Sequence, residues 1–273
     1  MKNNLDLFPA LDEELVISPE QIIAFRRDGF AVTPNLLKSA ELAIYRPVIL
    51  EAAQKLNTEN KKLADRDTYG KAFLQIMNLW VADERVKKFT LSKRFAKIAA
   101  DLLGVKNVRI YHDQALFKEP SGGPTPWHQD QYYWPLDSLN TVTMWMPLVP
   151  VTVEMGMLTF ASGSHINGCV FDTEISDESE TAFDQYVKKH QLKSFRPEHL
   201  NAGDATWHYG STIHQAPGNS SSIMREVMTI IYVADGIRIA KPVNSFQEND
   251  RLTWLGGLEP GSLVSAELNP VVL

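Results

Sequence analysis

The spacing of apolar residues changes near residue 107, and this change constrains the fold more than any other feature of the chain. Before it, apolar residues recur at helical spacing over 18–29, 37–56 and 83–103, with a break expected near Ser92. After it come short apolar or alternating runs, which are separated by glycine, proline and asparagine. The first part therefore predicts helices, and the second predicts antiparallel β structure.

Five strands are expected, over 108–118, 141–149, 156–161, 205–207 and 225–234. Short strands in one part and helices in the other favour an α+β fold with a mainly β core. We expect a jelly roll, or cupin-like double-stranded β-helix, with N-terminal helices packed outside. At 273 residues and 44% hydrophobic content the chain is expected to form one domain over 1–273. Its helical layer would span roughly 18–104 and its jelly-roll core roughly 107–240.

Two segments interrupt the strands: 121–126, which is rich in glycine and proline, and 172–191, which is acidic and then helical in pattern. Either they are loops around the mouth of the barrel, with 172–191 as a lid, or they are surface insertions.

Charge and hydropathy narrow the class of partner. Lysine and arginine total 27 against 33 acidic residues, which gives a formal net charge of −6, and no basic run stands out. This argues against nucleic acid and anionic membranes as partners and leaves a small-molecule substrate. Residues 1–9 are polar and no apolar run approaches membrane-spanning length, so a cytoplasmic protein is expected. The sequence carries no signal for an oligomeric state.

A candidate metal site begins at the run Trp127-His128-Gln129-Asp130. In extended chain His128 and Asp130 point to the same face, so both can bind one ion. His214, in a later polar turn, can supply the third ligand. Two histidines and one carboxylate leave the other positions of iron(II) open, as oxygen activation requires. The His-x-Asp pair alone also occurs by chance, and a lone histidine is more often structural.

Arg225 lies eleven residues after His214, at the start of an alternating segment that places it on the same face as Thr229 and Ile231. A buried guanidinium needs an anion. The far carboxylate of 2-oxoglutarate would bind it bidentately, and an internal ion pair is the alternative.

From about Ile22 to Tyr232 the chain resembles the phytanoyl-CoA dioxygenase family. The likeness rests on blocks in the family's order: Trp127-His128-Gln129-Asp130, Gly156-Met157-Leu158, Ser162-Gly163-Ser164-His165, Gly203-Asp204, His214 and Arg225. It implies an iron(II)- and 2-oxoglutarate-dependent dioxygenase. Such an enzyme uses O₂ to hydroxylate a small organic metabolite and releases succinate and CO₂.

The resemblance also implies roles for single residues, with no catalytic residue expected beyond the metal centre. The metal ligands would be His128, Asp130 and His214, and the cosubstrate contacts would be Arg225, Trp145 and Gln114. One departure is Ala216, where the family often has a serine that helps hold 2-oxoglutarate. Thr143, on the strand face of Trp145, could compensate. Related halogenases have a small residue in place of the carboxylate, so Asp130 favours hydroxylation.

Other polar and aromatic residues were weighed as cavity residues. Gln75 could reach the pocket, and His112 shares a strand face with Gln114. His165 is interpreted as structural, and a turn at Gly210 is expected to separate His208 from the face of His214. Five aromatic residues either line a substrate cavity or pack in the core: Trp127, Tyr132, Tyr133, Trp134 and Trp207.

Two other functions compete with the oxygenase. A cupin-type barrel could hold a metal for non-redox chemistry, or the chain could be a catalytically silent small-molecule binding protein. The spacing of Arg225 from His214 disfavours the first, and the intact ligand set disfavours the second.

Overall fold

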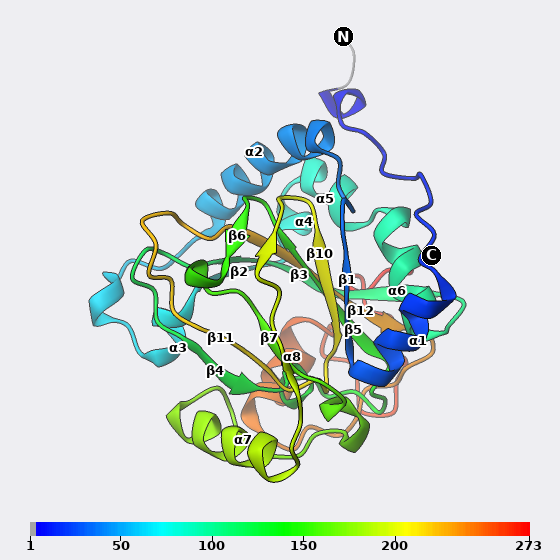
Figure 1. Ribbon diagram of the computed structural model, residues 1–273. Helices are drawn as coiled ribbons and strands as arrows, with labels where there is room; N and C mark the ends of the chain where they lie inside the picture. The colour runs from blue at the N-terminus through cyan, green and yellow to red at the C-terminus, as the bar shows by residue number, and fades with distance from the viewer. Residues whose placement is uncertain (1–3) are drawn as a thin grey trace.

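The computed structural model describes residues 4–273, which form a jelly roll of antiparallel strands flanked by helices (Figure 1). A six-stranded sheet has the order β1 (Phe30–Thr33), β10 (Ala205–Tyr209), β5 (Thr141–Pro147), β12 (Val227–Ala234), β3 (Val108–Phe117) and β2 (Leu74–Met77). A four-stranded sheet has the order β4 (Thr125–His128), β11 (His214–Ala216), β7 (Thr159–Ala161) and β8 (Ser194–Phe195). A small third sheet pairs β6 (Val151–Thr152) with β9 (His199–Leu200).

The N-terminal helices pack on the outer face of the six-stranded sheet (Figure 1). They are α1 (Pro19–Asp28), α2 (Ser39–Leu56), α4 (Leu79–Ala82), α5 (Glu84–Thr90) and α6 (Lys93–Leu103). The short helix α3 (Thr68–Ala72) instead contacts the segment 121–126, where the backbone N–H of Gly123 donates to the oxygen of Lys71 at 2.7 Å. Helix α1 begins with a capping box between Ser18 and Gln21 and ends at Gly29, whose φ of 87° is left-handed. The expected break near Ser92 is confirmed, because this residue caps α6.

The largest hydrophobic core lies between these helices and the six-stranded sheet. Strand β5 shows how one sequence serves two faces, because Val142, Met144 and Met146 belong to this core while Trp145 belongs to a separate cluster. Each fully buried apolar side chain contributes about 1.5–3 kcal/mol to stability. The helices thus anchor the outer face of the sheet and leave its inner face for the site.

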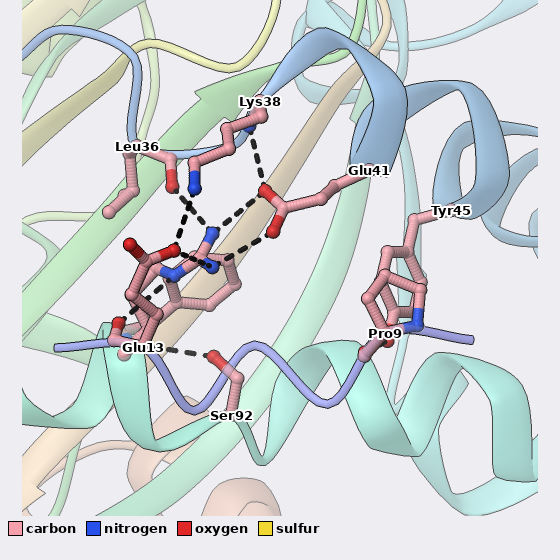
Figure 2. Close-up of polar contacts among 9 residues, drawn as sticks. Pro9, Glu13, Leu36, Lys38, Glu41, Tyr45 and Ser92 are labelled. Carbon is pink, nitrogen blue, oxygen red and sulfur yellow. Dashed lines mark hydrogen bonds and ion pairs between the residues drawn. The ribbon is translucent and has the colours of Figure 1, made fainter. Parts of the chain in front are cut away.

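Polar contacts tie the segment before α1 to this helical layer (Figure 2). Arg94, 2% exposed, donates from both terminal nitrogens to the carboxylate of Glu41, at 2.8 Å each. It also donates to the backbone oxygens of Leu36 and Glu13, both at 3.3 Å. Lys38 binds the Glu13 carboxylate at 2.7 Å. Arg94 thus links three segments of the chain. Removing one partner of a buried ion pair such as Arg94–Glu41 costs about 3–5 kcal/mol of stability.

The predicted strands are all present, with shifted ends. Strand β5 ends at Pro147 and β10 extends to Tyr209. Strand β7 starts at Thr159 because Gly156, at φ 87°, ends a 3-10 turn and cannot belong to a strand. Strand β12 starts at Val227, and Arg225 pairs with Lys118 as an isolated bridge.

Several elements were not predicted, and three of them, β1, β2 and α8, bear on the sheet and the site. Strands β1 and β2 lie in the part expected to be helical and form the two edges of the six-stranded sheet. Each has four residues and pairs with a partner far along the chain, so its local pattern is weak. Helix α8 (Ser245–Thr253) follows the expected core.

Segment 172–191 contains the helix that its pattern predicts, α7 (Asp177–Lys189). The segment expected as a loop, 121–126, runs into β4 at Thr125. No helix among residues 4–273 is both long and apolar enough to cross a membrane.

Candidate active site

The floor of the site is the inner face of the six-stranded sheet. Strand register aligns two rows of residues across β10, β5, β12 and β3: first His208, Thr143, Ile231 and His112, then Thr206, Trp145, Thr229 and Gln114. Because side chains alternate along a strand, both rows face the same way. Most of them line a cavity of about 520 Å³, whose other wall includes residues of β4 and β11. The sequence prediction that His112 shares a face with Gln114 is therefore confirmed.

Three candidate metal ligands converge in this cavity. His128 ends β4, Asp130 follows it by two residues, and His214 begins β11 directly opposite His128. The Nε2 atoms of His128 and His214 lie 3.5 and 3.7 Å from Oδ1 of Asp130. Among residues 4–273 this is the one group of three whose ligand atoms all lie within 4.8 Å of one another. This spacing fits a single ion at its centre.

Backbone carbonyls orient both imidazoles. Nδ1 of His128 lies 2.7 Å from the oxygen of Pro126, and Nδ1 of His214 lies 2.9 Å from that of Thr212. A carbonyl only accepts, so each Nδ1 carries the proton and each Nε2 presents its lone pair toward Asp130. Burial, together with His128 and His208, lowers the pKa of His214 well below its usual value. The ring is thus neutral, the form that binds metals.

The second oxygen of Asp130 is held separately from the first. Thr143 donates its hydroxyl to Oδ2 at 3.2 Å, and Nε2 of His208 lies 3.3 Å from the same atom. Oδ1 is thereby left toward His128 and His214. Burial acts to raise the pKa of Asp130, but its interactions with the imidazoles of His214, His128 and His208 hold that pKa well below its usual range.

The structure bears on two sequence-based expectations about these neighbours of Asp130. The turn at Gly210 does place β10 and β11 in different sheets, yet His208 reaches the site because β10 pairs with β5. Thr143 does not stand in for the hydroxyl missing at Ala216, because its own hydroxyl is engaged by Asp130. That role fits Thr125 better. It lies directly across from Ala216 on β4, and both residues line the cavity.

Arg225 is a buried cation without an acidic partner. It is 2% exposed, donates to the oxygen of Gly156, and lies 5.4 Å from the ring centre of Trp145. Its Nε has no hydrogen-bond partner, and it forms no salt bridge within residues 4–273. Burial lowers its pKa to about 9. The alternative of an internal ion pair is therefore excluded for this part of the chain.

A second basic residue, Lys118, lies beside Arg225, and the sequence analysis did not identify it. Lys118 is fully buried, and its backbone exchanges two hydrogen bonds with that of Arg225. Its ammonium donates to the hydroxyl of Thr125 at 3.3 Å. Burial and the charge of Arg225 lower its pKa to about 6. The pairing partner of Arg225 could not be known before the register of β3 and β12 was known.

Gln114 and Gln75 both line the cavity. Oε1 of Gln114 accepts from Nε2 of Gln75 at 2.6 Å, and Oε1 of Gln75 accepts from the hydroxyl of Tyr69 at 2.8 Å. These two hydrogen bonds use the oxygen of the Gln114 amide and leave its nitrogen available to donate. His165 is structural, as interpreted from the sequence, because it contacts the backbone oxygen of Arg26 at 3.0 Å.

Of the five aromatic residues weighed as cavity residues, Tyr133 and Trp134 line the cavity. Trp127 packs beside α7, and Trp207 lies in the largest core. Tyr132 contacts Phe246, with ring centres 6.0 Å apart. Glu174 and Ile175 of segment 172–191 also line the cavity, so that segment borders its mouth.

Helix α8 supplies a wall that the sequence analysis did not anticipate. Phe246, Asp250 and Trp254 all line the cavity. Their spacing of four residues places them on one helix face, and this spacing can be seen in the sequence. The hydroxyl of Tyr111 donates to Oδ2 of Asp250 at 2.8 Å, and burial raises the pKa of Asp250 to about 7.

Comparison with known proteins agrees with this geometry. The family model for phytanoyl-CoA dioxygenase (PhyH) matches residues 25–227. Phytanoyl-CoA dioxygenase 1 of Oryza sativa subsp. japonica is 30% identical over 149 residues, which cover 54% of this chain and 52% of the relative. A probable alpha-ketoglutarate-dependent hypophosphite dioxygenase of Stutzerimonas stutzeri is 26% identical over 185 residues, covering 66% and 61%. The match thus spans between half and two thirds of these relatives.

Solved structures share the fold over most of their length. The non-heme alpha ketoglutarate dependent carbocyclase SnoK from nogalamycin biosynthesis has a TM-score of 0.78 at 24% identity, covering 94% of this chain and 97% of that one. The epimerase SnoN, in complex with Fe³⁺, alpha ketoglutarate and nogalamycin RO, has a TM-score of 0.75 at 25% identity, covering 93% and 98%. EctD from S. alaskensis, with 2-oxoglutarate and 5-hydroxyectoine, has a TM-score of 0.65 at 21% identity, covering 88% of each.

Proposed function

This chain belongs to the phytanoyl-CoA dioxygenase family, and we therefore propose that it is an iron(II)- and 2-oxoglutarate-dependent dioxygenase that hydroxylates a small organic molecule. One observation carries the proposal. A two-histidine, one-carboxylate cluster shares a cavity with Arg225, a buried guanidinium that has no carboxylate partner within residues 4–273. A metal site for non-redox chemistry has no need of that free cation.

The metal would be held by Nε2 of His128, Oδ1 of Asp130 and Nε2 of His214. Both histidines are set in the metal-binding tautomer by backbone carbonyls, and Thr143 and His208 hold the other oxygen of Asp130. Three protein ligands leave positions for a chelating 2-oxoacid and O₂. When bound, the iron and 2-oxoglutarate activate O₂, with release of succinate and CO₂ as the substrate gains a hydroxyl group.

The far carboxylate of 2-oxoglutarate would bind Arg225. Its orphaned Nε and one terminal nitrogen offer a planar fork, and the Trp145 ring packs against the guanidinium. Thr125 supplies a hydroxyl across from Ala216, and Lys118 adds a second basic group behind it. Gln114 is the further proposed contact, through its amide nitrogen. An anion in this corner would raise the lowered pKa values of Lys118 and Arg225 and so stabilise their charged forms.

Conversion of 2-oxoglutarate without added substrate tests the proposal. The purified protein is incubated with iron(II), 2-oxoglutarate and O₂, and succinate is measured. We expect slow, metal-dependent succinate formation that Asp130→Ala abolishes. If the purified protein binds the metal but forms no succinate, the result would instead support a non-redox enzyme or a catalytically silent binding protein.

Arg225→Ala tests the cosubstrate anchor separately. Loss of the guanidinium should raise the 2-oxoglutarate concentration needed for half-maximal succinate formation by at least about tenfold, since a charge-assisted bidentate pair is lost. Metal affinity, measured by titration with Mn(II), should stay close to wild type. An unchanged 2-oxoglutarate requirement would remove Arg225 from the proposed site.

A further inference from the structure

The cavity has a second end whose chemistry the metal and cosubstrate do not use. Lys118 and Arg225 meet at one end of β3, whereas Tyr111 and Asp250 meet seven residues away along the same strand, roughly 20 Å distant. The wall there is the face of α8 that carries Phe246, Asp250 and Trp254. Helix α8 follows the residues 25–227 matched by the family model, so this wall belongs to a part of the chain outside that match.

Asp250 is a partly buried carboxylate without a cationic partner. Its Oδ2 accepts from Tyr111, and no salt bridge within residues 4–273 includes it. A carboxylate taken out of water needs a positive charge or a proton. Burial accordingly raises its pKa to about 7.

The neighbouring groups do not neutralise Asp250. His112 lines the same cavity and is 4% exposed, and its Nδ1 has no hydrogen-bond partner. Burial lowers its pKa to about 3, so the ring adds no positive charge. Among residues 4–273, Arg225 is the one lysine or arginine that lines the cavity. No positively charged side chain of the cavity therefore lies at the Asp250 end.

Aromatic residues flank Asp250 on its helix face, with Phe246 one turn before it and Trp254 one turn after it, and both line the cavity. The ring centre of Trp254 lies 6.2 Å from that of His112, and the ring centre of Phe246 lies 5.4 Å from that of Tyr133. The ring of Tyr111, which donates to Asp250, lies 5.5 Å from that of Trp134. A carboxylate among aromatic faces attracts an ammonium group through both the charge and the ring quadrupoles. An anionic ligand would be repelled, and a neutral one would leave Asp250 without a counter-charge.

We propose that the substrate carries a positively charged nitrogen, as a protonated amine or an alkylammonium, which binds at Asp250 between the aromatic rings of α8 and its neighbours. This inference rests on the proposed function, because it concerns the substrate of that same cavity. The Asp250 carboxylate pairs with the nitrogen. The remaining skeleton of the substrate then extends toward Asp130 and the metal.

Ligand binding tests this proposal without turnover. Protein loaded with Mn(II) and 2-oxoglutarate is titrated anaerobically with three probes of one skeleton, cyclohexylamine, cyclohexanol and cyclohexanecarboxylate, and tryptophan fluorescence is followed. We expect the amine to bind at least about tenfold more tightly than the other two. Equal affinities, or a preference for the carboxylate, would overturn the proposal.

Two carboxylate-to-amide variants localise the effect. Asp250→Asn should remove the preference for the amine, whereas Glu248→Gln, on the same helix but paired with Arg251 in solvent, should keep it. If Asp250→Asn fails to fold, as judged by circular dichroism, the wild-type ranking of the three probes still decides. Succinate formation without an amine preference would refute this inference alone, and an amine preference without succinate formation would refute the proposed oxygenase alone.

Discussion

At the scale of single residues, the two carboxylate oxygens of Asp130 make different contacts. Oδ1 faces His128 and His214, while Thr143 and His208 occupy Oδ2. A carboxylate held in this way keeps one orientation when the metal leaves, so the site is preorganised.

Removing one of these supports should weaken the metal site without deleting a ligand. We predict that His208→Leu lowers the affinity for Mn(II) by about 10- to 100-fold, the usual effect of losing an outer partner of a ligand. His208→Gln, which can still donate to Oδ2, should recover part of the loss. Metal titration of both variants checks this, and an unchanged affinity in His208→Leu would show that Thr143 alone suffices.

The hydroxyl opposite Ala216 gives a second residue-scale prediction. Thr125→Val keeps the shape of the side chain but removes a group that can bind 2-oxoglutarate, so the 2-oxoglutarate requirement should rise by about fivefold, as for one hydrogen bond. Adding Ala216→Ser in the same chain should restore it from the facing strand. Steady-state succinate formation over a range of 2-oxoglutarate concentrations measures the requirement of each variant. If Ala216→Ser does not restore it, Thr125 does not replace the hydroxyl missing at Ala216.

At the scale of elements, the turn before β7 connects backbone geometry to the cosubstrate corner. Gly156 has a φ of 87°, and its oxygen accepts from Arg225. A Cβ added there would lie 2.7 Å from the oxygen of Pro217 and 3.1 Å from Nη1 of Arg225. Only glycine lets the turn pack this closely against the guanidinium.

Gly156→Ala should therefore affect stability and cosubstrate binding together. We expect the free energy of unfolding to fall by at least about 1 kcal/mol, because a left-handed residue gains a Cβ, and the 2-oxoglutarate requirement to rise as Arg225 is displaced. Denaturant unfolding and succinate assays measure the two effects. The control is Gly236→Ala, which has a similar φ of 93° but no atom within 4 Å of the added Cβ. It should lose stability without changing the 2-oxoglutarate requirement.

At the scale of the whole molecule, the metal ligands join segments far apart in the chain. His128 and Asp130 lie on and after β4, and His214 lies on β11, which also pairs with β7. A bound ion would link these segments in the folded state but not in the unfolded chain, so binding must stabilise the fold.

Metal and cosubstrate should accordingly raise the melting temperature. At one hundred times the dissociation constant a ligand adds about 2.7 kcal/mol to the free energy of unfolding. We predict that Mn(II) raises the Tm, that 2-oxoglutarate raises it further only when the metal is present, and that a chelator reverses both effects. Thermal unfolding followed by circular dichroism measures this. Asp130→Ala should show no response, and a response equal to wild type would place the ion elsewhere.

Features that depend on local spacing and side-chain type could be predicted before the fold was known. The change of apolar period near residue 107 indicated helices before strands, and the two-residue spacing of His128 and Asp130 indicated a shared face. Arg225, on an alternating apolar segment, indicated a buried cation in need of an anion. These inferences could be made from short stretches of sequence, because helices and strands repeat within a few residues and the cost of burying a charge depends on the side chain itself.

Contacts between residues on different strands could not be predicted, because they depend on how the strands pair. His208 reaches Asp130, Thr125 faces Ala216 and Lys118 pairs with Arg225 because strands distant in sequence adopt one register. A shift of one residue would turn each side chain to the opposite face of its sheet, so these contacts have no local signature. The same holds for the wall that α8 adds, since its face is amphipathic in sequence but acquires a cavity to line only when the sheets have closed.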